Sequence, residues 1–302
     1  MKLALKVDID TFRGTQEGVP ALLRCLDRHK LQATFLFSLG PDHTGRAIKR
    51  VFRPGFFSKV SRTSVVSLYG YKTLMYGVLL PGPDIGKRCA DIMRSVKTAG
   101  HEVGIHTWDH VKWQDGVENA SDAWTERELD KATERFHDIF GERAKTHGAA
   151  GWQMNDHAIR LTEKMRFDYC SDSRGHSPFL PVVGKTVLRC PQIPTTLPTL
   201  DELIGVGDVN ENNVANFLLM RTAIEPAAPH VYTLHTELEG MKLMPAFDAL
   251  VSGWKTQGYR IGSVRGIYED LDVVRLPAHI FERGTLPGRS GTLMVQGQRF
   301  TE

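Results

Sequence analysis

Glu102-Val-Gly-Ile-His-Thr-Trp-Asp-His110 is the stretch that most directly indicates the fold. It begins with a short β-like run, Glu102-Val-Gly-Ile105, and continues into two histidines that are four residues apart. That spacing places both imidazoles on one face of a helical turn, where they can bind a single metal ion. We therefore expect a β-strand that leads directly into a metal site.

The same alternation of short apolar runs and helical patterns extends through most of the chain. Strand-like runs lie at 3–7, 33–37, 102–105, 146–150, 167–171, 187–190, 231–234 and 260–261. Helical patterns lie at 19–26, 84–96, 121–140, 155–165, 212–224 and 244–257. Such an order indicates βα units and a mostly parallel sheet. Seven or eight units predict a closed (β/α) barrel, and an open doubly wound sheet is the alternative. The Pro- and Gly-rich tail from Leu276 to Glu302 is expected to be irregular.

Polar residues stand at the ends of several of these strands. Asp8-Ile9-Asp10 follows the first apolar run, and His235 follows the run Val231–Leu234. In a barrel, catalytic side chains occupy the carboxyl ends of the strands. We therefore expect these residues to meet His106 at one end of the barrel. The alternative interpretation of the two Asp is a capping or turn pair, and that of His235 is a hydrogen-bonded strand end.

These residue types suit hydrolysis assisted by a metal. Asp10, His106 and His110 would supply three ligands and leave one position open, which is typical of catalytic sites. Asp8 could then act as the base, and His235 could protonate the leaving group. Zinc fits this ligand set, but cobalt, manganese and iron fit it as well.

Composition indicates an ordinary globular protein. The chain has 302 residues, of which 41% are hydrophobic and 24% charged, and we predict one domain, 1–302, with an insertion at about 41–83. The first residues do not resemble a signal peptide, and no apolar run approaches the length of a membrane span. The four cysteines lack C-x-x-C spacing and are expected to be free thiols in a reducing compartment, the cytoplasm.

The segment from His43 to Pro83 contains no acidic residue. It has seven cations, whereas the rest of the chain has a net charge of −4. Lys and Arg interleaved with aromatic residues favour the surface of an anionic membrane. Nucleic-acid binding and a solvated basic face on a helical cap are the alternatives. The cations are Arg46, Lys49, Arg50, Arg53, Lys59, Arg62 and Lys72, and the aromatic residues are Phe52, Phe56, Phe57, Tyr69, Tyr71 and Tyr76.

Asp8-Ile9-Asp10, His106-Thr-Trp-Asp-His110 and Leu234-His235 together resemble segments of the polysaccharide deacetylase family, which is also called NodB-like or carbohydrate esterase family 4. The resemblance implies a distorted (β/α) barrel and one divalent metal ion. It also implies that Asp8 is the base, that Asp10, His106 and His110 bind the metal, and that His235 is the acid.

Further segments resemble deformylases that act on a formamido-arabinose carried by undecaprenyl phosphate. They are Asp10–Gly14, Ser67–Gly70, Glu102–His110, Ala149–Trp152, Gln192–Pro198 and Glu237–Gly240. This resemblance implies a peripheral enzyme on the cytoplasmic face of the inner membrane, whose product serves lipid A modification and polymyxin resistance. We predict no binding of nucleic acid and no protein partner. A deacetylase of another N-acetyl sugar and a non-catalytic lipid-sugar binding protein are the alternatives.

The sequence departs from the broader family near the expected base. Ala149-Ala-Gly-Trp152 stands where the family has a segment with an Arg that contacts the base, and Arg13 and Arg174 are candidates to replace it. Asp172 resembles the family Asp that tunes the acidic His. The remaining candidates for sugar contact or support are Trp108, Trp113, Trp152 and Glu237.

Overall fold

The computed structural model describes residues 1–47 and 70–301. The predicted insertion is therefore described only at its two ends. Most of its basic and aromatic residues, from Lys49 to Tyr69, lie outside the described residues, and so does the resemblance at Ser67–Tyr69. Among the cations of the segment, Arg46 and Lys72 are described, and both are exposed.

Seven parallel strands form the main sheet in the order β5-β4-β3-β2-β1-β8, with β9 also pairing with β1. The long strand β1 (Lys2–Ile9) lies centrally, between β2 (Thr34–Ser38) and β8 (His230–His235). The other strands are β3 (Glu102–Thr107), β4 (Thr146–His147), β5 (Tyr169–Cys170) and β9 (Arg260–Gly262). All were predicted, although β4 and β5 are shorter than expected.

An extended segment without regular strand pairing bridges the gap between β5 and β8. The Ile193 N–H donates to Cys170 O (2.8 Å), and the Thr196 N–H donates to Val231 O (3.0 Å). The segment 191–197 therefore has backbone hydrogen bonds to both flanking strands. The sheet is a parallel half-barrel, and this segment explains why the barrel is distorted rather than regular.

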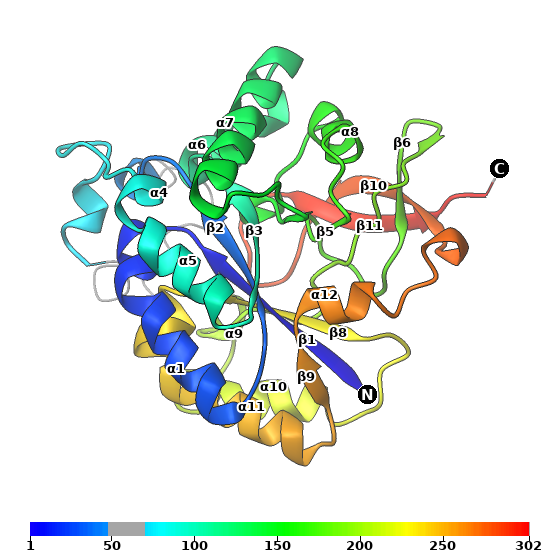
Figure 1. Ribbon diagram of the computed structural model, residues 1–302. Coiled ribbons are helices and arrows are strands. Elements are labelled where there is room, and N and C mark those ends of the chain that lie inside the picture. The colour runs from blue at the N-terminus through cyan, green and yellow to red at the C-terminus, as the bar shows by residue number, and fades with distance from the viewer. Residues whose placement is uncertain (48–69, 302) are drawn as a thin grey trace.

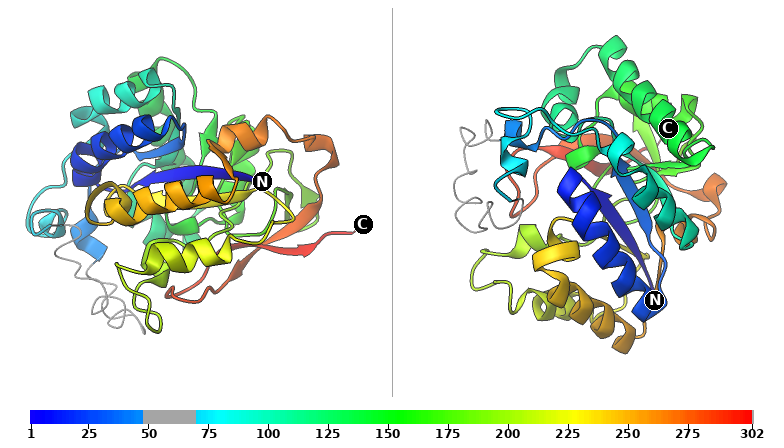
Figure 2. Two further views of the ribbon diagram at one scale, coloured as in Figure 1. Left: turned by 90° about the horizontal axis from the view of Figure 1, so that it is seen from below. Right: turned by 60° about the vertical axis from the view of Figure 1, so that its left-hand side comes forward.

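Helices cover the outer face of this sheet (Figures 1 and 2). Around the outside, α7, α5, α1, α11 and α10 pack one against the next. The helix predicted at 84–96 is divided at Cys89, whose backbone (φ −116°, ψ 14°) is not helical. The helices are α1 (Val19–His29), α4 (Ile85–Arg88), α5 (Ala90–Thr98), α6 (His110–Gly116), α7 (Asp122–Phe140), α8 (Asp156–Lys164), α9 (Leu200–Leu203), α10 (Val214–Arg221), α11 (Met244–Thr256) and α12 (Val264–Tyr268).

A second sheet of four strands lies beside the barrel, at the right of Figure 1, in the order β11-β10-β6-β7. It contains β6 (Leu180–Val183), β7 (Thr186–Val187), β10 (Ala278–Gly284) and β11 (Leu293–Arg299). The expectation of an irregular tail after Leu276 is therefore wrong. Phe281 and Met294 of the β10–β11 hairpin bury their side chains in a second apolar cluster, which stabilises strands that the tail's Gly and Pro content obscured.

Alternation along β1 separates the core from the site. Leu3, Leu5, Val7 and Ile9 belong to the main apolar cluster beneath the helices. The intervening positions, Lys6 and Asp8, lie on the opposite face of the strand and are nonetheless buried. Polar side chains thus occupy the barrel interior, close to the carboxyl end of the sheet. The four cysteines are free and buried, as predicted.

Candidate metal centre and active site

Asp10, His106 and His110 meet at the carboxyl ends of β1 and β3. Oδ1 of Asp10 lies 3.2 Å from Nε2 of His106, and Oδ2 lies 3.4 Å from Nε2 of His110. One ligand atom from each residue lies within 4.8 Å of the others. The carboxyl ends of β1 and β3 thus bring together residues that are nearly 100 positions apart in the sequence, and the three predicted ligands converge.

Hydrogen bonds at the second ring nitrogen orient the first histidine. Nδ1 of His106 donates to the Gly148 carbonyl oxygen (2.6 Å), which leaves the lone pair of Nε2 directed at Asp10. The prediction that both histidines lie on one helical turn is wrong, because His106 is in β3 and only His110, the first residue of α6, is helical. Asp109 caps α6 by accepting from the Lys112 N–H (3.1 Å). Asp109 also contacts Nδ1 of His43 (2.6 Å), so this unpredicted carboxylate helps to fix the position of His110.

The donor set fits a divalent cation. Oδ1 of Asp10 is buried but accepts no hydrogen bond from the described residues. Burial alone would raise the pKa of Asp10, but the neighbouring His110 and His106 lower that pKa well below its usual value. One ionised carboxylate and two imidazoles are the ligands expected of a catalytic zinc site or of a related transition-metal site.

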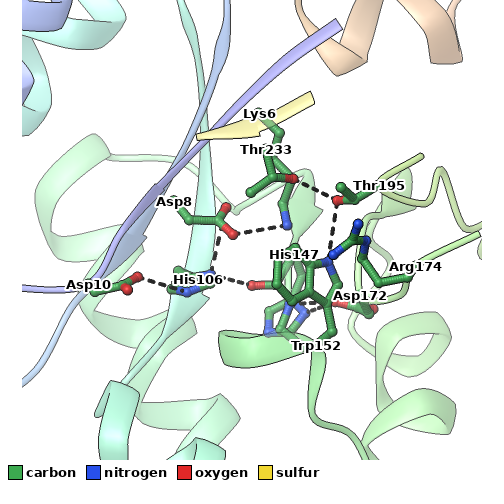
Figure 3. A network of polar contacts seen from close by, with 12 residues as sticks. Lys6, Asp8, Asp10, His106, His147, Trp152, Asp172, Arg174, Thr195 and Thr233 are labelled. Atoms are coloured by element: carbon green, nitrogen blue, oxygen red, sulfur yellow. Dashed lines mark hydrogen bonds and ion pairs between the residues drawn. The ribbon is translucent and has the colours of Figure 1, made fainter. Parts of the chain in front are cut away.

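Asp8 lies on the inner face of β1, next to this centre (Figure 3). Its Oδ2 accepts a hydrogen bond from Nζ of Lys6 (3.1 Å), and the two side chains form a buried ion pair. Oδ1 has no hydrogen-bond partner among the described residues and lies 4.0 Å from Nδ1 of His106. Asp8 therefore has one oxygen held by a cation and a second that is available to accept a proton.

The two arginines considered for contact with Asp8 have other ion-pair partners. Arg13 pairs with Glu17 on the next turn (3.1 Å). Arg174 pairs with the buried Glu202 (2.6 Å) and also donates to Leu197 O. Lys6, which sequence reasoning did not single out, is the cation beside Asp8. Its position two residues before Asp8 on a strand was the available signal, since such residues share a face.

His235 ends β8 directly opposite Asp8 in the strand register. Its backbone N–H donates to Glu239 (2.9 Å), while Nδ1 is buried without a hydrogen-bond partner among the described residues. Burial favours the neutral ring, but the carboxylates of Asp10, Asp201 and Asp8 outweigh it and raise the pKa of His235. A raised pKa suits a proton donor. Asp201, on α9, is a further residue that sequence reasoning missed.

Glu237 joins the turn after β8 to the turn after β1. Its Oε1 accepts from both the N–H (2.8 Å) and the hydroxyl (2.7 Å) of Thr11, and from the Asp10 N–H (3.3 Å). A Cβ on Gly14 would lie 2.0 Å from the same oxygen, so a larger residue there would displace the Glu237 carboxylate. Burial and the Asp10 carboxylate raise the pKa of Glu237 to about 7. Its contacts support the loop that contains Asp10.

Asp172 is buried, and its hydrogen bonds are made to residues other than His235. Its Oδ1 contacts Nδ1 of His147 (2.7 Å) and accepts from the Ala149 N–H (2.9 Å), and its Oδ2 accepts from Gln192 (3.0 Å). These contacts hold the segment after β4. The structure therefore gives Asp172 a supporting position, and it does not place it among the carboxylates that raise the pKa of His235.

Burial removes two of the three tryptophans as surfaces for a sugar. Trp152 is 2% exposed, and Trp113 is 1% exposed. Three cationic side chains lie over the Trp152 ring, at distances from the ring centroid of 5.2 Å for Lys6, 4.9 Å for Arg174 and 4.6 Å for Arg289. Trp108 is partly exposed, with Arg135 over its ring at 5.1 Å, and is the remaining candidate.

A family model described as polysaccharide deacetylase matches residues 3–170. The chain belongs to the polysaccharide deacetylase family, as its strand-end residues had indicated. A solved structure from Mycobacterium smegmatis has a TM-score of 0.63 at 17% identity, and the match covers 94% of each chain. This likeness confirms the predicted α/β fold.

Two relatives are more specific. A protein from Shewanella sediminis (strain HAW-EB3), named a probable 4-deoxy-4-formamido-L-arabinose-phosphoundecaprenol deformylase, is 40% identical over 250 residues, covering 83% of this chain and 80% of that protein. A protein with the same name from Wigglesworthia glossinidia brevipalpis is 31% identical over 285 residues, covering 94% and 98%. The predicted resemblance to these deformylases is confirmed.

Proposed function

We propose that this chain is a metal-dependent deformylase of 4-deoxy-4-formamido-L-arabinose linked to undecaprenyl phosphate. The observation that carries the proposal is 40% identity to a protein of that name over most of the chain, with Asp8, His235 and the Asp10–His106–His110 centre meeting at one end of the barrel. The products are formate and a free amino sugar, which serves lipid A modification and thereby polymyxin resistance.

The residues divide the hydrolysis of the formamide among themselves. Asp10, His106 and His110 would hold one divalent ion, which when bound polarises the formyl oxygen and lowers the pKa of water. Asp8 accepts a proton from the attacking water. His235, whose pKa is raised by neighbouring carboxylates, donates a proton to the departing amine. An amine departs readily only when protonated, so the acid is as necessary as the base.

The experiment that tests this function follows formate release from the formamido lipid, with zinc, cobalt, manganese or iron added in turn. We expect the wild type to release formate with at least one metal, and Asp8→Asn to lose at least 100-fold in kcat, because general base catalysis contributes about 10²–10⁴-fold. The acetamido counterpart of the lipid tests the deacetylase alternative. Faster release of acetate than formate, or full activity in Asp8→Asn, would contradict the proposal.

We also infer that the insertion contacts an anionic membrane, where the polyprenyl carrier resides. Its described ends expose large apolar side chains, including Tyr71 (74%) and Leu79 (77%), beside the exposed cations Arg46 and Lys72. In the described ranges, 1–47 and 70–301, no helix has the length and apolarity needed to cross a bilayer. A peripheral position on the cytoplasmic face of the inner membrane suits this combination. Each cation near such a surface contributes about 1 kcal/mol.

Sedimentation with anionic liposomes tests the membrane contact. We expect the protein to sediment with vesicles that contain phosphatidylglycerol, less so at high salt, and to lose this when Arg46, Lys49, Arg50 and Arg53 are replaced by Ser. The control replaces four exposed cations elsewhere, namely Arg24, Lys30, Arg260 and Arg275. Equal sedimentation of both variants would refute the contact.

A further inference from the structure

A lysine is completely buried inside the barrel, where lysines are rarely found unless paired. Lys6 has no solvent exposure, and it lies on the inner face of β1, two residues before Asp8. Its Nζ lies 3.1 Å from Oδ2 of Asp8. Burying two charges costs free energy that their mutual attraction does not always recover. A buried pair at this position therefore requires an explanation other than stability.

The residues around Lys6 leave space for its side chain and favour its charge. The Trp152 ring lies 5.2 Å from Nζ (Figure 3), and its electron-rich face favours a cation. A Cβ on Gly148 would lie 2.9 Å from Cε of Lys6, so the absent side chain leaves the space that Lys6 occupies. The carbonyl of the same glycine accepts the hydrogen bond from His106. The segment after β4 thus holds Lys6 and orients a metal-centre histidine at once.

We propose that Lys6 is a positioning residue for Asp8, an inference that rests on the function proposed above. Lys6 holds Oδ2, which leaves Oδ1 as the oxygen that accepts the proton. Oδ1 lies 4.0 Å from His106, buried and without a hydrogen-bond partner among the described residues. In the step itself an O–H bond of water breaks, and its proton forms a bond to Oδ1. The electron pair stays on the water oxygen, which forms the bond to the formyl carbon as the C=O π pair moves onto the formyl oxygen.

A purely structural ion pair predicts a different outcome from a positioning role. If Lys6 only stabilises the strand, its removal lowers stability and leaves the kinetic constants of the folded fraction unchanged. If Lys6 holds Asp8 for proton transfer, its removal lowers kcat while substrate binding continues. The split between kcat and KM therefore distinguishes the two roles.

The variant Lys6→Met keeps a long side chain and removes the charge. We expect kcat to fall about 10–100-fold, as for other residues that orient a reacting group, with KM changed less than about threefold and the content of bound metal unchanged. The matched control is Lys2→Met on the same strand, where an ion pair with Asp270 is lost far from the site. An unchanged kcat in Lys6→Met, or a change in KM alone, would overturn the proposal.

Thermal denaturation provides a second test that does not depend on the substrate. Lys6→Met leaves the buried Asp8 carboxylate without its cation, so we expect Lys6→Met/Asp8→Asn to melt at a higher temperature than Lys6→Met. If Lys6→Met alone fails to fold, a folded double variant still supports the pairing. Failure of both variants to fold overturns it. The kinetic comparison uses whichever amide the wild type hydrolyses. If the wild type hydrolyses another amide but not the formamido lipid, the proposed function is refuted, and the test of Lys6 is still valid.

Discussion

Histidines of this chain serve different purposes according to what their ring nitrogens contact. Nδ1 of His106 donates to a carbonyl and leaves Nε2 directed at the metal centre. His101 is also buried, but its Nδ1 accepts from the Ala33 N–H (3.2 Å), which requires a neutral nitrogen. Burial lowers the pKa of His101 from its usual value of 6.5. The two histidines thus have different roles because their ring nitrogens contact different groups.

The lowered pKa of His101 predicts a loss of stability in mild acid. Below the unfolded-state value of 6.5, the unfolded chain binds a proton at this ring that the folded chain does not, so stability falls with pH until the folded-state pKa is reached. The variant His101→Asn retains an acceptor without titrating. We expect its urea midpoint to fall less between pH 7 and pH 5 than that of the wild type. Equal losses would show that His101 is not responsible.

At the scale of elements, two glycines set the distance between the turns that follow β1 and β8. The turns are η1 (Gly14–Gly18) and η6 (Leu238–Lys242). A Cβ on Gly18 would lie 2.3 Å from the Thr236 carbonyl oxygen, and one on Gly240 would lie 2.9 Å from Cα of Gly18. These close approaches hold the loops of Asp10 and Glu237 together, so helical packing outside the barrel affects the geometry within it.

Gly18→Ala tests this coupling. The added methyl group must displace backbone, so we expect a loss of about 1–3 kcal/mol in the free energy of unfolding, together with a lower kcat. Gly262→Ala on β9 is the control, because its Cβ would meet nothing within 4 Å. Both effects are read from urea denaturation and the formate assay. A Gly18→Ala enzyme as stable and active as the control would contradict the argument.

For the whole molecule, a metal ion at the proposed centre would connect distant parts of the chain. The proposed ligands follow β1, stand near the end of β3 and begin α6, so an ion bound there would stabilise only the folded state. At a free metal concentration 100 times Kd, the gain is about 2.7 kcal/mol. The extended segment 191–197 closes the side of the barrel that lacks strand pairing, through its backbone hydrogen bonds to β5 and β8.

We therefore expect metal-loaded protein to melt at a higher temperature than protein treated with a chelator. His110→Gln should lose this difference, because one of three ligands is removed. His29→Gln is a matched control, since His29 lies near Cys25 and Asp248 in a separate group of possible metal ligands. Differential scanning calorimetry measures the effect. A difference that persists in His110→Gln and vanishes in His29→Gln would place the metal at the other group.

Periodicity and strand ends determined much of what the sequence could predict. Alternation along β1 reports local geometry, and in a parallel sheet the carboxyl ends of strands share one edge. The spacing of His106 and His110 indicated the right pair of residues for the wrong reason, since His106 stands on β3 and only His110 on α6. The metal centre, Asp8 and His235 could therefore be named together from the sequence. The tail could not be assigned, because β10 and β11 are stabilised by packing against distant residues rather than by a local pattern.

The sequence by itself determined the order of βα units and which polar residues stand at strand ends, because both follow from neighbours along the chain. Strand alternation places Lys6 and Asp8 on one face, but only the tertiary structure decided that Lys6, rather than Arg13 or Arg174, meets Asp8. It also decided which tryptophans are buried and which carboxylates surround His235. Some of these pairings join residues more than 220 positions apart, such as Asp8 and His235. They depend on strand register, on the curvature of the sheet and on the space left by Gly148, none of which a local pattern encodes.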